Sequence, residues 1–376
     1  MKGYSAKTLI RYFLLGLLTA LVVRKIVIGR AAMGYVQECK TQVDFEAMIS
    51  DSAFSATVSN FSSTKPRMIV IQNQHALNMT FNWLCNTAAM SNVHESTVIV
   101  TLDEESRKSI QSAWPGITVL HWPIGCLKDA FNYGDGRYQL FYLFRSNLAR
   151  AFLHFGKPFW MIQQDTFWRE SLLTLEIENT QKSADIIFDR AAEGKEEDSS
   201  IIAGGYYFAR PTCSAKTFFK QLSHDLETFY TPDNAYMTSL CSNKGLAKCG
   251  HVPFSVITNW IWLHEPGRLS DPQKIPLLIQ FDGDTKLGGK LGKMKSLGFY
   301  FVKEDGRKCN QDAVKQAQDL ILKQRDSLNI ASVKSYSHLQ FGLYQWFIDQ
   351  FYKSEPTRLF MEKVIFPYAH YFMITL

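Results

Sequence analysis

Short apolar runs separated by polar breaks fill the chain after residue 66, and their lengths and spacing predict both strands and helices. The predicted buried strands cover residues 68–72, 96–102, 117–120 and 159–162. The predicted helices cover residues 79–90, 103–113 and 140–155, the second of them capped by its leading acids. Strands that alternate with helices indicate parallel βαβ units, so we expect an α/β domain whose sheet is covered by helices.

The N-terminal region has a different pattern, because residues 12–23 form an uncharged apolar run with basic residues on both sides. Twelve helical residues cross only about 18 Å, whereas the hydrocarbon layer is about 30 Å thick, so a span would extend from Thr8 to Ile28. We predict a membrane-anchor helix over residues 8–28 after a cytosolic tail, residues 1–7. A signal-peptide core with a small-residue site at Ala31-Ala32 is one alternative, and an amphipathic or buried helix is the other.

Features after this run agree with placement in a secretory lumen. The triplets that begin at Asn60 and Asn78 are glycosylation sequons. The seven cysteines allow up to three disulfides with one thiol left over, although the sequence does not give the pairing. The alternative is that all seven are small buried thiols. The net charge of +6 is spread without a basic stripe, so we expect no nucleic-acid partner.

Two segments flank the predicted α/β domain, which we assign to residues 67–334. Residues 29–66 lack strong periodicity and contain a Ser/Thr/Asn-rich patch from Ser52 to Thr64, so we predict a luminal stem. Residues 335–376 are rich in aromatic side chains, but neither of their apolar runs is long enough to cross a membrane. We predict that this C-terminal segment packs on the catalytic domain, with contact at a membrane surface as the alternative.

In the stretch FWMIQQDTFWRES, residues 159–171, a single acid interrupts the aromatic and aliphatic residues between Phe159 and Trp168. This acid, Asp165, comes just after the predicted buried strand at 159–162. Ligands of parallel sheets bind beyond the carboxyl ends of the strands, where loops project polar groups into a crevice. Asp165 is therefore placed where a carboxylate can face a ligand or a metal ion.

Several segments of the chain, taken in order, resemble the nucleotide-diphospho-sugar transferase family, which comprises GT-A-type glycosyltransferases of the secretory pathway. The resemblance runs from about Met68 to Gly306. The segments that carry it are Asn82-Trp83-Leu84, VIVTLDEES at residues 98–106, Gly156 to Trp168, Ala184-Asp185-Ile186, Gly205 to Thr212, and Asp233-Asn234. The resemblance implies a GT-A-like, Rossmann-type mixed sheet flanked by helices, preceded here by the membrane-anchor helix.

The resemblance also implies a metal site, although this sequence departs from the family pattern there. The family's Asp-x-Asp motif aligns with Gln163-Gln164-Asp165, so an amide replaces the first acid. Mn²⁺ or Mg²⁺ takes oxygen ligands and keeps substrate phosphates in its shell, so we assign Asp165 and Gln163 as the metal ligands. The histidine that the family often has near Phe281 is absent here, which weakens the expectation of metal dependence.

The same resemblance assigns residues to the nucleotide sugar and to catalysis. The residues predicted to bind the nucleotide-diphosphate sugar are Asn73, Asp103, Arg145, Gly204, Gly205 and Lys286. Asp233 and Arg210 are the predicted catalytic residues, with Asp233 near a sugar hydroxyl or the acceptor. Three of these assignments have structural alternatives: helix capping for Asp103, a β-bulge for the two glycines, and a solvated basic turn for the loop that carries Lys286.

Together these patterns predict a single-pass type II membrane protein of the Golgi or ER with a luminal catalytic domain. Its expected reaction is transfer of a hexosyl or pentosyl group from a nucleotide-diphosphate donor to a glycan, glycoprotein or glycolipid acceptor, assisted by a divalent metal. The alternative is an inactive luminal relative that binds glycan or a partner protein, because one acid of the metal motif and the histidine are missing.

Overall fold

The computed structural model describes residues 6–131, 135–190, 202–242, 245–254, 256–258, 276–281, 289–304, 306, 308–323 and 354–360. Within them, seven strands form one mixed sheet in the order β3-β2-β1-β4-β7-β6-β8. Its strands are β1 Arg67–Gln72, β2 Thr97–Thr101, β3 Thr118–His121, β4 Phe159–Ile162, β6 Ile186–Arg190, β7 Ile202–Ala209 and β8 Cys249–His251. Strands β1 to β4 are mutually parallel neighbours, and β7 runs antiparallel to both β4 and β6.

Helices cover both faces of this sheet, as expected for buried strands with apolar residues on both sides. They are α1 Ala6–Cys39, α2 Phe45–Ser50, α3 Ser52–Ser59, α4 Leu77–Thr87, α5 Val93–Ser96, α6 Glu104–Ala113, α7 Gly136–His154, α8 Ile177–Thr180, α9 Cys213–Thr228, α10 Asp233–Ser242, α12 Gly289–Ser296, α13 Gln311–Lys323 and α15 Glu355–Phe360. Four short 3-10 helices are η1 Lys40–Val43, η2 Gln74–Ala76, η3 Gly125–Leu127 and η4 Leu172–Leu175. The predicted α/β class, a mixed sheet flanked by helices, is confirmed.

Alternating residues of the central strands supply two separate hydrophobic cores. In β1, Ile69 and Ile71 join the core under α7 and α9, whereas Met68 and Val70 join the core under α4. The second core also includes a small three-stranded sheet in the order β5-β10-β9. Its strands are β5 Thr166–Trp168, β10 Leu278–Gln280 and β9 Ile257–Thr258.

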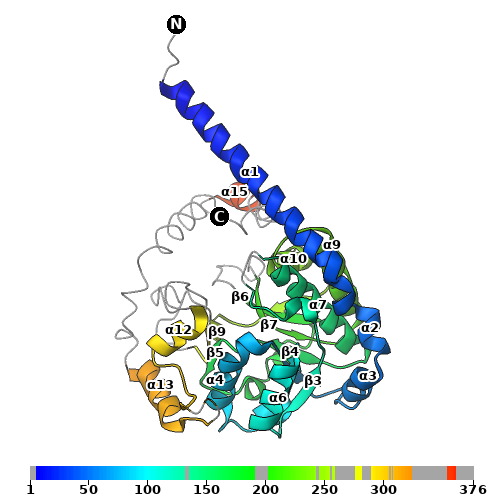
Figure 1. Ribbon diagram of the computed structural model, residues 1–376, viewed down its shortest axis with the longest axis vertical. Helices are drawn as coiled ribbons and strands as arrows, with labels where there is room; N and C mark the ends of the chain where they lie inside the picture. Colours follow the sequence, from blue (N-terminus) through cyan, green and yellow to red (C-terminus); the bar gives the residue numbers. More distant parts are fainter. Residues whose placement is uncertain are drawn as a thin grey trace.

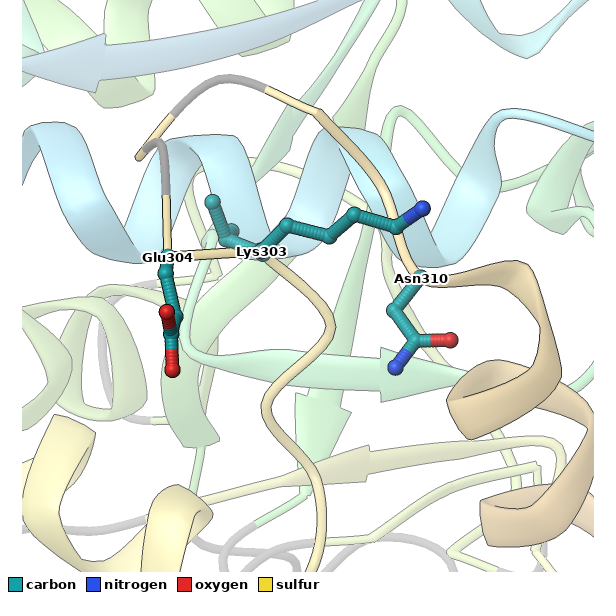
Figure 2. Close-up of a pocket in the computed structure, with 4 residues that line it drawn as sticks. Lys303, Glu304 and Asn310 are labelled. Carbon is teal, nitrogen blue, oxygen red and sulfur yellow. The ribbon is translucent and has the colours of Figure 1, made fainter.

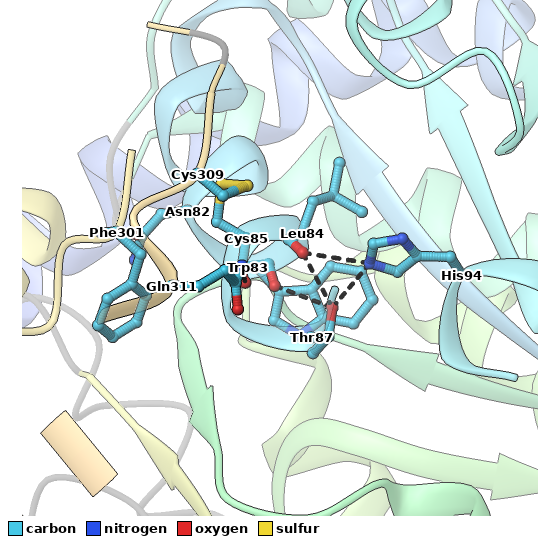
Figure 3. Close-up of a disulfide and its surroundings, with 9 residues drawn as sticks. All are labelled: Asn82, Trp83, Leu84, Cys85, Thr87, His94, Phe301, Cys309 and Gln311. Carbon is cyan, nitrogen blue, oxygen red and sulfur yellow. Dashed lines mark hydrogen bonds between the residues drawn. A yellow bond between two sulfur atoms is a disulfide. The ribbon is translucent and has the colours of Figure 1, made fainter. Parts of the chain in front are cut away.

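Two of the three disulfides connect segments that are distant in the chain, the third closes a short loop across 8 residues, and Cys213 is left as an exposed free thiol. The pairs are Cys39–Cys126, Cys85–Cys309 and Cys241–Cys249. The expectation of three bridges and one leftover cysteine agrees with this pattern. Figure 3 shows how Cys85–Cys309 joins α4 to the segment before α13, where Gln311 donates to the Cys85 carbonyl.

Helix α1 is 34 residues long and projects from the domain at its N-terminal end (Figure 1). It is the one helix among the described residues that is long and apolar enough to cross a membrane, a test that a signal sequence also passes. Its large apolar side chains that lie at the surface are between 36% and 70% exposed. They are Ile10, Tyr12, Phe13, Leu15, Leu17, Val22, Val23, Ile26 and Val27.

The segment that we predict to be a stem is mostly folded onto the domain in this structure. Val36, Val43, Met48 and Phe54 are buried in the core under α7. Asp44 and Asp51 cap α2 and α3 by accepting hydrogen bonds from backbone amides three residues on. Two short capped helices bury few side chains each, so their apolar residues give too little periodicity to detect. The predicted C-terminal segment lies outside the described residues except for 354–360.

Candidate active site

The strand directions bring most of the predicted site residues to one edge of the main sheet. Parallel strands β1, β2 and β4 end at this edge, and the antiparallel strand β7 begins there. Asn73 follows β1, Asp103 follows β2, and Gln163 and Asp165 follow β4, while Gly204 and Gly205 lie near the start of β7. This is the position at which open α/β sheets bind ligands.

Asp165 is buried at this edge and forms an ion pair with Lys290 in the first turn of α12. The Asp165 side chain is 4% exposed, whereas the Lys290 side chain is 33% exposed. The Asp165 backbone carbonyl also accepts a hydrogen bond from Phe281 N at 2.8 Å. The acid that interrupts the aromatic run is therefore held by a lysine 125 residues further along the chain.

The amide side chain of Gln163 is also engaged within the protein, because its Oε1 accepts a hydrogen bond from Gln280 Nε2. Gly205 lies against this pair. A Cβ atom added at Gly205 would be 3.0 Å from both Gln163 Oε1 and Gln280 Nε2. At Gly204, φ is +78° and an added Cβ would lie 2.9 Å from Asn234 Cβ. Both glycines are thus required by close packing.

Arg145 and Asp233 form a buried ion pair, with Arg145 Nη1 3.0 Å from Asp233 Oδ2. Arg145 Nη2 also donates to the Gly205 carbonyl at 3.0 Å, and the guanidinium lies 5.0 Å from the centre of the Tyr207 ring. Burial raises the pKa of Asp233 to about 6, although Arg145 opposes this shift. The predicted donor-binding arginine and the predicted catalytic acid are therefore direct partners.

Asp189, at the end of β6, is a site residue that sequence reasoning missed. Its two carboxylate oxygens accept hydrogen bonds from Gly204 N at 2.8 Å and Tyr206 N at 2.9 Å. Burial raises the pKa of Asp189 to about 7, against the opposing effects of the Tyr206 amide and Arg145. An available signal was that Asp189, like Asp165, is an acid at the end of an apolar strand.

Tyr138, in the first turn of α7, lies close to the same charged groups. Burial raises the pKa of its phenol, and the charges of Lys290, Asp233, Asp165 and Arg145 also act on it. Its ring makes an edge contact with Tyr142, with ring centroids 4.8 Å apart. Sequence reasoning missed Tyr138 as well, because nothing in its local pattern distinguishes it from the other aromatics of α7.

The residues at and just after the ends of β1 and β2 lie at the same edge of the sheet. Asp103 caps α6 through Ser106 N at 2.8 Å and also accepts from Gln74 N at 2.7 Å. Asn73 donates to the Leu127 carbonyl at 3.0 Å. Gln72 is 2% exposed, and neither polar atom of its side chain has a hydrogen-bond partner within the described part of the chain. An unsatisfied buried amide at the end of a central strand calls for an explanation, such as a bound ligand.

Two of the predicted site residues, Arg210 and Lys286, are not placed with the others at this edge of the sheet. Arg210 follows the far end of β7, five residues and about 17 Å from Gly205, because β7 is extended. There its guanidinium donates to the backbone carbonyls of Ala184 and Glu178. Arg210 therefore supports the loop before β6 and lies apart from the other predicted site residues. Lys286 lies outside the described residues.

The metal site predicted at Asp165 and Gln163 does not fit the described residues as they are arranged. A divalent ion prefers several oxygen ligands and requires their lone pairs. The one carboxylate is paired with the Lys290 ammonium, which would repel a nearby cation, and the amide oxygen is bonded to Gln280. Among the described residues, no group of three or more His, Cys, Asp or Glu side chains could hold a metal.

A surface hollow lies away from the site residues at the sheet edge, at the turn between α12 and α13 (Figure 2). Its lining residues are Val302, Lys303, Glu304 and Asn310. The adjacent Cys309 is tied to Cys85 in the C-terminal half of α4, whereas the site residues lie at the edge where α4 begins. The hollow therefore is separate from the candidate active site.

Residues 92–297 match the model of the nucleotide-diphospho-sugar transferase family, which is more than half of the chain. The chain belongs to this family. The matched region includes β2, β4, β6, β7 and the residues that meet at the sheet edge, with the exceptions of Gln72 and Asn73. The family resemblance expected from the sequence is thereby confirmed.

Solved glycosyltransferases share only a distant likeness with this protein. The bifunctional glycosyltransferase WbbM is 11% identical with a TM-score of 0.41, over 60% of this chain and 47% of that one, so the chain spans about half of WbbM. Mouse xyloside xylosyltransferase 1 is 10% identical with a TM-score of 0.38, over 57% and 96% of the two chains. The galactosyltransferase LgtC is 9% identical with a TM-score of 0.40, over 68% and 95%. A search of curated proteins found no match.

Proposed function

We propose that this protein transfers a sugar from a nucleotide-diphosphate donor to a glycan, protein or lipid acceptor in the lumen of the Golgi or ER. Residues 8–28 are its retained, type II membrane anchor, residues 67–334 form the catalytic domain, and residues 1–7 lie in the cytosol. Three disulfides support an oxidising compartment, and exposed Asn60 and Asn78 are accessible for glycosylation. The buried position of Ala32 against Tyr230 supports a helix that is not cleaved at this point.

The observation that carries this proposal is the position of Lys290, in the first turn of α12, on Asp165 at the ligand-binding edge of the sheet. This contact places the N-terminus of α12 at the site, where backbone amides and the helix dipole favour an anion. When a nucleoside diphosphate leaves the anomeric carbon, negative charge grows on its phosphates. The Lys290 ammonium and the α12 amides stabilise that charge, as a metal ion does in the expected family pattern.

The remaining groups at this edge divide between the two ends of the donor. Gln72 at the end of β1, together with Asn73 and Asp103 after β1 and β2, serves the nucleoside end of the donor. The unsatisfied Gln72 amide offers the nucleoside both a hydrogen-bond donor and an acceptor. Asp233 is the acid that contacts a hydroxyl of the transferred sugar or the acceptor. Arg145 positions Asp233 and fixes the Gly205 carbonyl, so that the glycine backbone can approach the sugar.

A second candidate function is a luminal protein that binds glycan or a partner without turnover. It is favoured by one specific observation, namely that Asp165 and Gln163 both already have protein partners where the family pattern expects metal ligands. The two functions differ in one measurable respect. A transferase hydrolyses or transfers from the donor, whereas the inactive relative binds nucleoside diphosphate without turnover.

The test is donor hydrolysis by the full-length protein against a panel of nucleotide sugars, with variants that separate folding from chemistry. Lys290→Met leaves the buried Asp165 carboxylate unpaired, so it lowers both stability and turnover. The double variant Asp165→Asn with Lys290→Met removes that charge and should regain the melting temperature but not turnover. Lys295→Met, on the exposed face of the same helix, is the matched control. Turnover by the double variant at the wild-type rate would overturn the assignment of Lys290.

A further inference from the structure

Helix α1 runs without a break from its exposed apolar half into the core of the catalytic domain. The exposed apolar side chains end at Val27, and Gly29 already packs on the domain, since an added Cβ there would lie 3.6 Å from Tyr230 Cβ. Ala32 and Tyr230 are both buried in one cluster with Ile28. The described chain therefore has no linker between the proposed span and the folded domain.

The C-terminal half of α1 is fixed to the domain by several contacts of different kinds. Cys39 is disulfide-bonded to Cys126, and Tyr35 donates a hydrogen bond to the Cys126 carbonyl at 2.5 Å. Gln37 Nε2 donates to the carbonyl of Glu227 at 3.0 Å. An added Cβ at Gly136 would lie 3.0 Å from Tyr35 Cβ, so α7 begins in close contact with α1. These contacts hold the C-terminal half of α1 rigidly against the domain.

The residues of the candidate site lie close to the C-terminal half of α1. Tyr230, which touches Gly29, is only three residues from Asp233, and Gly136, which touches α1, is two residues from Tyr138. Three residues span at most about 11 Å, so the Cα of Asp233 lies within about 17 Å of the Cα of Gly29. Figure 1 agrees, because α10 lies at the end of the domain from which α1 projects.

An exposed aromatic side chain marks the same end of the domain. Outside α1, Phe229 and Phe360 are the large hydrophobic side chains that are exposed within the described residues. Phe229 is 48% exposed and directly precedes Tyr230. Aromatic rings at this level are favoured at a membrane interface, where they sit among the headgroups. Phe229 thus offers a second exposed apolar side chain, next to the residue that contacts α1.

On the basis of the proposed function, we propose that the active site works at the bilayer surface, on an acceptor sugar carried by a membrane lipid. If the hydrocarbon layer ends near Ile28, the headgroup layer occupies roughly the next 5–7 Å, so Asp233 lies about 10 Å beyond it at most. Because α1 is fixed rigidly to the domain, the site stays close to the headgroup layer. A lipid-borne sugar is always present there, whereas a soluble glycoprotein enters it only by collision with the membrane.

The placement is tested with the full-length protein in phosphatidylcholine vesicles that contain headgroup spin-labelled lipids. A fluorophore is attached either to native Cys213 or, in a Cys213→Ser background, to Phe229→Cys. Cys213 is the control because it begins α9, about 24 Å along that helix from the membrane-proximal end. We expect quenching at position 229 to exceed that at Cys213 several-fold. Inserting Glu-Ala-Ala-Ala-Lys-Glu-Ala between Val27 and Ile28 raises the domain by about 10 Å and should abolish this difference.

The acceptor class is tested by transfer of label from nucleotide sugars to monosaccharides carried on a dialkyl lipid in the same vesicles or on a short water-soluble chain. We expect at least a tenfold preference for the lipid-borne acceptors, lost in the insertion variant while its donor hydrolysis stays within twofold of wild type. Equal quenching at the two positions overturns the inference. So does transfer without a preference for lipid, or no transfer to either acceptor by a protein that hydrolyses the donor. Normal quenching without any donor binding or hydrolysis contradicts the proposed transferase function instead.

Discussion

Replacing Asp189 by asparagine should remove a pH dependence of stability that this buried acid imposes. The pKa of Asp189 is raised from 3.8 to about 7 by burial, so the folded state binds its proton more tightly than the unfolded chain does. This stabilisation is fully present below pH 4 and is lost as the pH rises through 7. At about 1.4 kcal/mol per pKa unit, the full loss is about 4 kcal/mol, of which roughly 3 kcal/mol falls between pH 5 and pH 8.

The assay is thermal unfolding of the purified full-length protein at pH 5, 6, 7 and 8, with Asp189→Asn as the partner variant. At roughly 2 °C per kcal/mol for a domain of this size, wild type should lose about 6 °C more than the variant between pH 5 and pH 8. The difference between the two proteins isolates Asp189 from Asp233, which titrates in the same range. Parallel pH profiles for the two proteins would show that burial does not raise the pKa of Asp189 in this way.

Three further predictions address the glycine packing, the metal motif and the compartment. Gly205→Ala should lower donor turnover on the order of tenfold or more by displacing the Gln163–Gln280 pair, whereas Gly116→Ala, which meets nothing within 4 Å, should not. Gln163→Asp restores the first acid of the family motif and should make turnover responsive to added Mn²⁺; an unchanged response in metal titrations would count against the alignment. Asn60→Gln should remove part of the mass shift produced by endoglycosidase, and no shift from wild type would argue against a luminal domain.

The periodicity of apolar residues was sufficient to predict the central strands, because a strand buried on both faces must be apolar along its whole length. Strands β1, β2, β3 and β4 lie within a residue or two of their predicted bounds. The position of Asp165 beyond β4 followed from the same pattern. Helices α2 and α3 were not predicted, because each buries only one or two side chains and is stabilised by a capping aspartate.

Other parts of the site depend on contacts that no local pattern contains. Lys290 meets Asp165 across 125 residues, and Arg145 meets Asp233 across 88, so neither pair is visible in spacing. Arg210 lies apart from the other predicted site residues for a geometric reason, since the eight residues of β7 carry the chain from one edge of the sheet to the other. The resemblance at residues 205–212 therefore located the strand β7, but it did not show which end of that strand faces the ligand.

The central claim is that Lys290, held by Asp165, takes the place of a metal ion beside the donor phosphates. The most direct measurement is the rate of nucleotide-sugar hydrolysis by the full-length protein in the presence of excess chelator, compared with the rate in Mn²⁺. The two rates should agree within a factor of two, and Lys290→Met with Asp165→Asn should lower both at least 100-fold. A rate that disappears with chelator and returns with Mn²⁺, in a protein with Lys290 intact, would contradict the claim.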